Sequence, residues 1–458
     1  MFRIVVLVLI LWDSQCANAA ERTNGTSPTE TRIILVSDRK EPEPNEFNPA
    51  ECFDRIWSII KDEFWDPNFN GIDWTDARQR YKPKALAAED HESFALIINQ
   101  MLGELKTSHT CYFTRWEPEY YTLQAALISG SLTMFATSDT SVVEKHQPGL
   151  YASKANPHRV GIGVVSRIIE GRHYVTAVLS TSPAEKAGIV PGDWLLEVDG
   201  RPFHPIRSFE GKADKEVELT FQRGPSVSTR RSTRIIPIDS KERELFENDS
   251  YSRVMLIEYG GHQFTYIRLW WLSGWAMQQV LESGMMPPKS EGLIIDIRDG
   301  FGGSQGYEYI TPFIQYGLGR ITIESTRRGQ TSTSEVGFNK PVILLINGGS
   351  RSGKELLAYY FKKTGRGLLV GERTAGFVTG GRWKRISKDS MLYYCVMTMS
   401  IDGKILEGVG IEPDIEVPFD IRFAAGNDIQ LQRAKDEMVK LIEASKPSCS
   451  KKIIEDSL

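Results

Sequence analysis

Helical spacing of apolar side chains marks the first part of the chain. Apolar residues recur at three- and four-residue steps over residues 52–64, and the same spacing returns over residues 94–105. A helix that buries one face has this period. We therefore predict a helical N-terminal domain at residues 46–157, with an irregular insertion from residue 114 onward where neither period is visible. The role of that insertion stays open among a lid, a substrate gate and an oligomer contact.

Short alternating runs replace the helical spacing further along the chain. Apolar and polar side chains alternate over residues 174–178 and again over residues 216–221. Such alternation is typical of strands that bury one face. The pattern predicts a small β module at residues 158–238.

Apolar runs and helical patterns then alternate over residues 253–425. The predicted strands are residues 266–270, 293–297, 321–324, 342–346 and 392–399. The predicted helices are residues 275–281, 307–316 and 354–363. This alternation indicates an α/β core around a largely parallel sheet, and residues 426–458 contain one further amphipathic helix. The expected fold is a multidomain α+β protein.

The chain begins with a pattern typical of secretion signals. A positive charge at Arg3 precedes an apolar run at residues 4–12, and Ala17 and Ala19 form an Ala-x-Ala site. We predict a signal peptide at residues 1–20 and a flexible lead at residues 21–45, and therefore an exported protein, periplasmic or extracellular. A buried strand or a short anchor is the alternative. No later run approaches the roughly 20 apolar residues of a membrane span.

Composition and charge narrow the class of partner. The 458 residues carry a formal net charge of -4, which gives no electrostatic reason to expect nucleic acid. Signal cleavage would leave Cys52, Cys111, Cys395 and Cys449, none of them in a metal-binding spacing. We therefore expect neither a metal nor another cofactor, and one or two disulfides whose pairing stays open.

The segment 341–355 is the strongest candidate for chemistry. A buried strand runs into a Gly-rich turn, and a helix follows directly after Ser352. A hydroxyl at this junction faces helix N–H groups that can hold an oxyanion. Ser352 is therefore a candidate nucleophile. The alternative is that Ser350 or Ser352 only caps the helix.

A second serine matches a known nucleophile motif. Ser304 lies in the G-x-S-x-G pattern of residues 302–306, and in that elbow the histidine partner follows the serine. The last histidine of this chain is His262, so Ser304 lacks such a partner. We interpret Gly302 and Gly303 as a turn whose N–H groups could serve an oxyanion hole.

A serine nucleophile needs a base, and His109 is the best candidate among seven histidines. It follows a predicted helix that ends in small and polar residues, which would leave the imidazole accessible beside the hydroxyl of Ser108. A polar surface residue at a helix end is the alternative.

Five segments in this order resemble the C-terminal processing peptidase and tricorn-core serine protease family, peptidase family S41. They are residues 102–109, 293–303, 347–355, 370–376 and 407–414. The resemblance implies a ClpP/crotonase-like catalytic core. It also implies the following roles: Ser352 as nucleophile, His109 as base, Ser108 and Glu407 as orienting residues, and the N–H groups of Gly353, Gly302 and Gly303 as oxyanion donors.

The sequence also departs from the family pattern. Many members use a Ser/Lys dyad, but the position matching that lysine is Phe377. Arg351 and Lys354 replace the small residues usual around the serine. Catalysis would therefore depend on His109.

The β module resembles a PDZ domain, through residues 182–193 and 198–202. PDZ domains bind an extended C-terminus as an added strand and hold its carboxylate with backbone N–H groups. The resemblance places those donors at Val160, Gly161, Ile162 and Gly163. A module that only buttresses its neighbours is the alternative.

The resulting hypothesis is an exported serine endopeptidase. It would hydrolyse polypeptides by Ser-His acyl transfer, capture substrate with its PDZ-like module and use no cofactor; a homo-oligomer is compatible with the resemblance. The alternative is a catalytically silent binding or carrier protein on the same fold.

Overall fold

The computed structural model describes residues 46–128, 157–224, 229–303, 306–314, 320–325, 330–335 and 337–446. Residues 1–43 and 44–458 form two units, and every described residue belongs to the second. The predicted signal peptide and flexible lead, most of the irregular insertion, Ser304 and Cys449 lie outside the described residues. The signal peptide and export therefore stay predictions.

The predicted N-terminal helices form, with a third helix between them. They are α1 (Pro49–Glu63), α2 (Trp74–Leu86) and α3 (His91–Gly103), followed by strand β1 (Cys111–Thr114) and helix α4 (Pro118–Ile128). Side-chain oxygens of Asn48, Asp73 and Asp90 accept N–H groups in the first turns of α1, α2 and α3, which satisfies donors that a helix leaves free. The apolar faces of α1 and α3 are buried against each other, with Phe53 and Phe94 fully enclosed.

A distant hairpin completes this N-terminal layer. Strands β17 (Gly380–Ser387) and β18 (Ser390–Met397) form an antiparallel hairpin, and β18 also pairs with β1, with Cys111 opposite Tyr393. Leu392 and Tyr394 are buried in the same cluster as the N-terminal helices. The sequence pattern correctly predicts a strand here but wrongly assigns it to the parallel sheet, because its apolar side chains pack on the helices instead.

The β module spans strands from residue 158 to residue 241. These are β2 (His158–Gly161), β3 (Val164–Ile169), β4 (Arg172–Val178), β5 (Asp193–Val198), β6 (Arg201–Pro202), β7 (Val217–Arg223), β8 (Arg230–Ile235) and β9 (Ile238–Lys241), with helix α6 (Pro183–Lys186). The main sheet has the order β3-β4-β5-β7-β8, β6 pairs with β5, and β2 pairs with β9. Among the described residues, β3 is therefore an edge strand that could accept another strand.

The core contains one six-stranded sheet. Its order is β10 (Met255–Tyr259), β11 (His262–Arg268), β12 (Leu293–Asp296), β15 (Val342–Ile346), β16 (Leu368–Gly371) and β21 (Ile415–Glu416). All neighbouring pairs are parallel except β10 with β11. The predicted strand at residues 321–324 lies outside this sheet, because β13 (Arg320–Ser325) forms a separate antiparallel hairpin with β14 (Gln330–Glu335).

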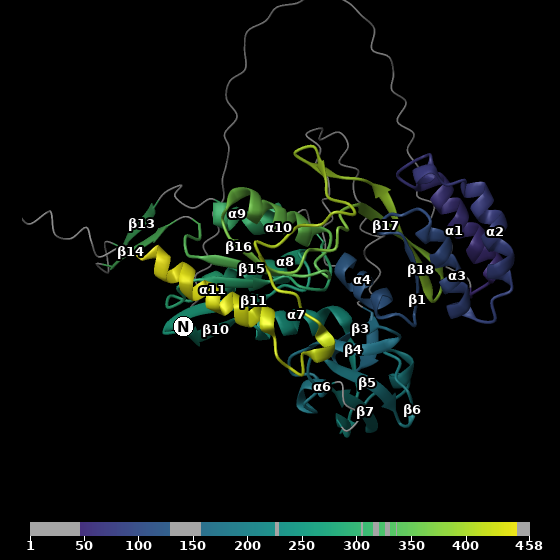
Figure 1. Cartoon of the computed structure of the whole chain (residues 1–458), viewed down its shortest axis with the longest axis horizontal. Helices are drawn as coiled ribbons and strands as arrows, with labels where there is room; N and C mark the ends of the chain where they lie inside the picture. Colours follow the sequence, from purple (N-terminus) through teal and green to yellow (C-terminus); the bar gives the residue numbers. More distant parts are fainter. Residues whose placement is uncertain are drawn as a thin grey trace, which may run out of the picture. The chain divides into compact units, whose positions relative to one another are not determined.

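Helices cover both faces of the core sheet (Figure 1). Along β15 the side chains alternate, so Val342, Leu344 and Ile346 pack in one cluster and Ile343 and Leu345 in another. The first cluster includes residues of α8 (Gly274–Met285), α9 (Tyr307–Ile314) and α10 (Gly353–Thr364), and the second those of α11 (Ile429–Ser445). The carboxyl end of β15 therefore emerges from a rigid core that is covered on both faces.

Helix α7 (Glu242–Ser252) connects the β module to strand β10 of the core sheet.

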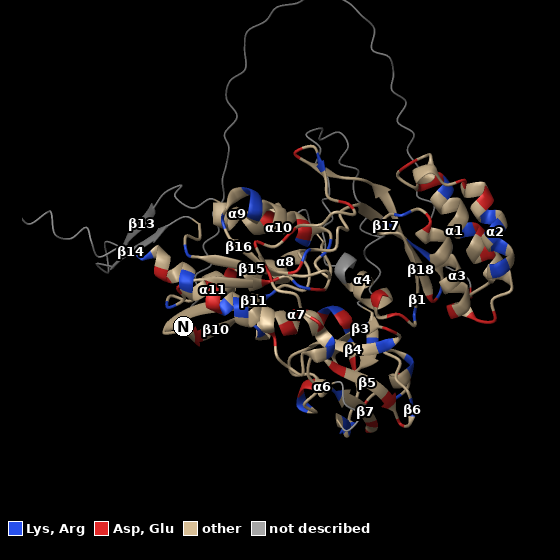
Figure 2. Cartoon of the chain, viewed as in Figure 1, with Lys and Arg blue, Asp and Glu red and all other residues tan. Residues whose placement is uncertain are grey.

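Acidic and basic side chains are mixed on the exposed helices (Figure 2). On α1 and α2, for example, Asp54 pairs with both Arg78 and Lys82 at 2.7 Å. Among the described helices, none has the length and apolar character needed to cross a membrane.

Candidate active site

The turn after β15 presents Ser352 at the start of α10. Ser352 has φ +56° and ψ −127°, a conformation that residues with a side chain rarely adopt. The neighbouring Ser350 is buried, and its hydroxyl donates to the carbonyl oxygen of Ile297 (2.9 Å) and accepts the N–H of Asn347 (3.1 Å). Ser350 is therefore a structural hydroxyl, whereas Ser352 occupies a strained junction between strand and helix.

Glu355 fastens this turn to the loop at residues 374–377. Its carboxylate accepts hydrogen bonds from the Thr374 hydroxyl (2.6 Å) and from the N–H groups of Gly376 (2.7 Å), Phe377 (2.7 Å) and Ser352 (3.2 Å). Burial raises the pKa of Glu355, and these hydrogen bonds oppose that rise. Glu355 was not predicted as a site residue, although a Ser followed three residues later by Glu is a helix-capping signature that could have indicated it.

Ser108, His109 and Glu407 form a hydrogen-bonded chain. The Ser108 hydroxyl lies 2.8 Å from His109 Nδ1 and donates to Glu407 Oε2 (3.0 Å), while the Ser108 N–H donates to Glu407 Oε1 (2.7 Å). Because the single hydroxyl proton of Ser108 goes to the carboxylate, its lone pair is left to accept a proton from Nδ1. This network favours the tautomer in which Nε2 carries the free lone pair.

Thr379 adds a second hydroxyl to this chain. Its Oγ1 lies 3.1 Å from His109 Nδ1 and 2.9 Å from Ser108 Oγ, and it donates to the Ser108 carbonyl oxygen. Thr379 was not predicted as a site residue, because nothing in its local sequence pattern distinguishes it from other polar residues; it lies in the loop just before β17.

The environment of His109 keeps its imidazole neutral. Burial lowers the pKa of His109 to about 4, and the nearby Arg351 guanidinium contributes in the same direction. The ring of Tyr393 lies beside it, with 5.3 Å between ring centroids. A neutral imidazole can accept a proton, which a base in acyl transfer must do.

One short segment, Phe377 to Thr379, links the serine and histidine sides. The Phe377 carbonyl accepts the Ser352 N–H (2.8 Å), the Val378 N–H donates to Glu407 (2.7 Å), and Thr379 contacts His109. In the described part of the chain no hydrogen bond joins the His109 ring to the Ser352 hydroxyl. Such contacts often form only when substrate is bound.

Gly302 packs directly against the proposed nucleophile. A Cβ atom at this position would lie 2.4 Å from the Gly353 nitrogen and 2.5 Å from Ser352 Cβ, so only glycine permits the approach. Gly353 is the first residue of α10, where backbone N–H groups lack partners within the helix. Gly303 forms a parallel bridge with Leu272. The predicted oxyanion glycines thus lie around Ser352.

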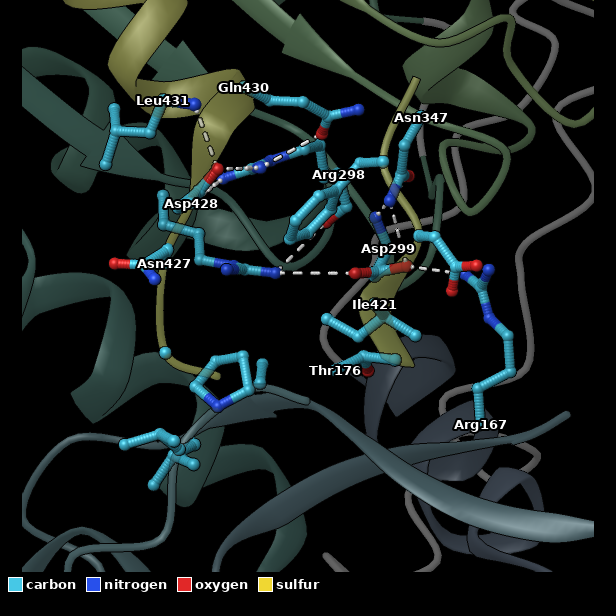
Figure 3. A pocket seen from close by; sticks show the side chains of 18 of the residues that line it. Arg167, Thr176, Arg298, Asp299, Asn347, Ile421, Asn427, Asp428, Gln430 and Leu431 are labelled. Carbon is cyan, nitrogen blue, oxygen red and sulfur yellow. Dashed lines mark hydrogen bonds and ion pairs between the residues drawn. The ribbon is translucent and has the colours of Figure 1, made fainter. Parts of the chain in front are cut away.

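Buried groups anchor the loop that carries Gly302. Lys354 is fully buried, and its Nζ donates to the Asp299 carbonyl oxygen (2.6 Å); burial holds its pKa well below the usual value. Figure 3 shows the Asp299 carboxylate between Arg167 (3.0 Å) and Asn347 (3.3 Å), at the edge of a cavity of about 740 Å³. Side chains of both the core and the β module therefore hold this loop in place.

The predicted peptide-binding residues lie where β2 leads into β3. Val160 and Gly161 pair with β9, Ile162 is buried, and Gly163 has φ +78° and would meet Ser182 within 2.2 Å if it had a Cβ atom. A cavity of about 570 Å³ runs beside β3, and its lining includes Gly161 to Ile168 as well as Arg351. The edge strand and the turn before Ser352 therefore share one cavity.

Three family models match different parts of the chain. Residues 263–417 match peptidase family S41, residues 47–103 match the tricorn protease C1 domain, and residues 174–223 match the PDZ domain. These matches confirm the predicted family resemblance and the PDZ prediction.

Known proteins with related sequences are proteases by name. The chain is 26% identical over 471 residues to a putative tricorn protease homolog 2 of Streptomyces coelicolor, covering 97% of this chain and 36% of that protein. It is 25% identical over 334 residues to a carboxyl-terminal-processing protease of Synechocystis, covering 70% of this chain and 69% of the relative. The chain thus spans about a third of the tricorn homologue.

A solved structure of the tricorn protease has a similar fold. The TM-score is 0.50 at 19% sequence identity, over 86% of this chain and 37% of that one. This similarity supports the predicted multidomain fold.

Proposed function

Because residues 263–417 of this chain are a peptidase family S41 region, we propose that it is a serine endopeptidase with Ser352 as nucleophile and His109 as general base. The observation that carries the proposal is the segment Phe377 to Thr379, which contacts Ser352, Glu407 and His109 at once. A shared loop segment of this kind, fixed by hydrogen bonds to both sides, can position a nucleophile and a base relative to each other.

In the proposed reaction, His109 Nε2 takes the hydroxyl proton of Ser352 as the oxygen attacks a peptide carbonyl. His109 then gives that proton to the leaving amine, and water releases the acyl group by the same steps. Ser108 and Glu407 orient the imidazole and stabilise the positive charge that forms on it. The N–H groups of Gly353 and of Gly302 or Gly303 bind the oxyanion, each such donor being worth about 2.7–4 kcal/mol of barrier.

We further propose that the PDZ module presents substrate to this site. An extended peptide added along β3 would lie in the cavity that also reaches Arg351, one residue before Ser352. The second candidate function, a silent binding protein, would use the same edge strand without turnover. The neutral imidazole of His109, which follows from its lowered pKa, and the strained backbone of Ser352 favour the enzyme over the binding protein.

Labelling with a fluorophosphonate, which reacts with activated serines, tests the proposal. We expect labelling of the wild-type protein, loss of labelling in Ser352→Ala and strong reduction in His109→Ala, with circular dichroism confirming that each variant is folded. Ser304→Ala serves as the matched control and should label normally. Loss of labelling in Ser304→Ala with Ser352→Ala unaffected would refute the site, and a folded wild-type protein that neither labels nor cleaves peptides would support the binding protein.

A further inference from the structure

Arg351 is a cation without a carboxylate partner beside the proposed nucleophile. It precedes Ser352 directly and lines the cavity of about 570 Å³ that runs along β3. Its guanidinium lies 5.8 Å from the Phe301 ring centre, and its Nε makes one long hydrogen bond, 3.4 Å, to the Gly349 carbonyl oxygen. Across the described residues, no Asp or Glu lies within ion-pair distance of it.

Most other charges that line this cavity neutralise one another. Arg159 forms a bidentate ion pair with Glu242, through hydrogen bonds of 2.9 and 3.0 Å. Arg167 pairs with Asp299 at 3.0 Å. Arg351, by contrast, forms no ion pair with the described residues of the lining.

Two further carboxylates line the cavity, and neither forms an ion pair with Arg351 among the described residues. The Glu117 carboxylate accepts the N–H and hydroxyl of Thr114. Glu119 is exposed to solvent. Burial lowers the pKa of both His173 and His204, which keeps these rings neutral near pH 7.

The walls near Arg351 strengthen its attraction for an anion. Trp270 and Trp271 are fully buried members of the lining, and Phe301 is partly buried. Such apolar walls lower the local dielectric, so a charge pair formed there is stronger than one in water. A guanidinium also presents two parallel N–H groups that match the two oxygens of a carboxylate.

We propose that Arg351 binds a substrate carboxylate next to the scissile bond, so that the preferred substrates carry an acidic side chain or their free C-terminus at that position. The inference rests on the proposed peptidase function and deepens it by naming the substrate class. Arg351 is a specificity residue, since it precedes the nucleophile by one position and shares the cavity of the edge strand.

Binding of such a carboxylate has a consequence for the base. The Arg351 charge contributes to the low pKa of His109. A bound anion cancels part of that field and raises the basicity of His109 in the complex. Acidic substrates would therefore gain in turnover as well as in binding.

Matched peptides test the inference. Cleavage sites are first mapped by mass spectrometry in a mixed peptide library, and kcat/KM is then measured for pairs that differ only in Glu or Gln beside the cleaved bond. A second pair differs only in a free or amidated C-terminus. We expect at least about a tenfold preference for the carboxylate member of one pair, and that pair identifies the source of the carboxylate.

Variants assign the preference to Arg351. Arg351→Met should abolish the preference, Arg351→Lys should retain part of it, and Arg382→Met, which removes an exposed charge on β17, should leave it unchanged. In Arg351→Met the acid limb of the kcat/KM profile should also move to higher pH, which a merely structural defect would not produce.

Two outcomes would overturn the inference. One is equal kcat/KM for both members of both pairs in the wild-type protein; the other is a preference that survives in Arg351→Met. Fluorophosphonate labelling of Ser352 distinguishes these failures from failure of the peptidase proposal, because labelling with a neutral probe requires an active serine but no carboxylate.

Discussion

Replacement of Glu355 by Gln should loosen the turn that presents Ser352. One carboxylate oxygen accepts hydrogen bonds from Thr374 and Gly376, and the other accepts from Phe377 and Ser352. Gln keeps one acceptor oxygen and directs an NH₂ group at two of the four donors. If the NH₂ group faces Thr374 and Gly376, the Thr374 hydroxyl can turn and accept, so one hydrogen bond is lost; if it faces Phe377 and Ser352, two are lost.

The magnitude follows from the loss of one or two hydrogen bonds. A hydrogen bond to a charged group contributes about 1.5–3 kcal/mol, so the loss costs about 1.5–6 kcal/mol. The carboxylate itself is costly to bury, as its raised pKa indicates, which moves the expected value to the lower half of this range, about 3 kcal/mol. This corresponds to a fall of roughly 150-fold in the folding equilibrium constant.

Urea unfolding followed by tryptophan fluorescence measures this loss, and kcat reports the effect on the site. We expect a lower unfolding midpoint and a kcat reduced at least about tenfold, because displacement of a reacting group costs rate steeply. Glu282→Gln is the matched control, since Glu282 is exposed on α8 and its replacement should change stability by less than about 0.5 kcal/mol. Equal midpoints and equal kcat in wild-type protein and Glu355→Gln would refute the reasoning.

Two further predictions concern His109 and Gly302. Since the pKa of His109 is lowered to about 4, the acid limb of the kcat/KM profile should lie near pH 4, and an acid limb near pH 6.5 would contradict this. The free energy of unfolding should rise as the pH rises from about 4 to 6.5, because only the unfolded state binds this proton in that range. Gly302→Ala should lower kcat by about 10²–10³ by displacing Gly353, whereas Gly103→Ala, with nothing within 4 Å, should not; equal kcat values in these two variants would contradict the predicted loop position.

Local pattern was sufficient for most of the elements. The strand at residues 342–346 has the predicted bounds, and helices α8 and α10 each begin one residue before their predicted starts. Periodicity predicts such elements because a helix or strand that buries one face, or both, has apolar residues at a regular local spacing. The motifs around His109 and Ser352 were likewise visible in the sequence, and their catalytic roles stay predictions.

The partners of each element were decided by tertiary packing. Strand β18 pairs with β1 and packs on the N-terminal helices, although its sequence would suit the parallel sheet equally well. The contacts of Thr379 and Glu355 to the site depend on the loop at residues 374–379 lying against two distant segments. The spacing of apolar and polar residues predicts which face of a helix or strand is buried, but it does not identify the element that packs against that face. The chain alone therefore determined the candidate nucleophile and base, while only the fold could bring a hydroxyl, a carboxylate and an unpaired guanidinium around them.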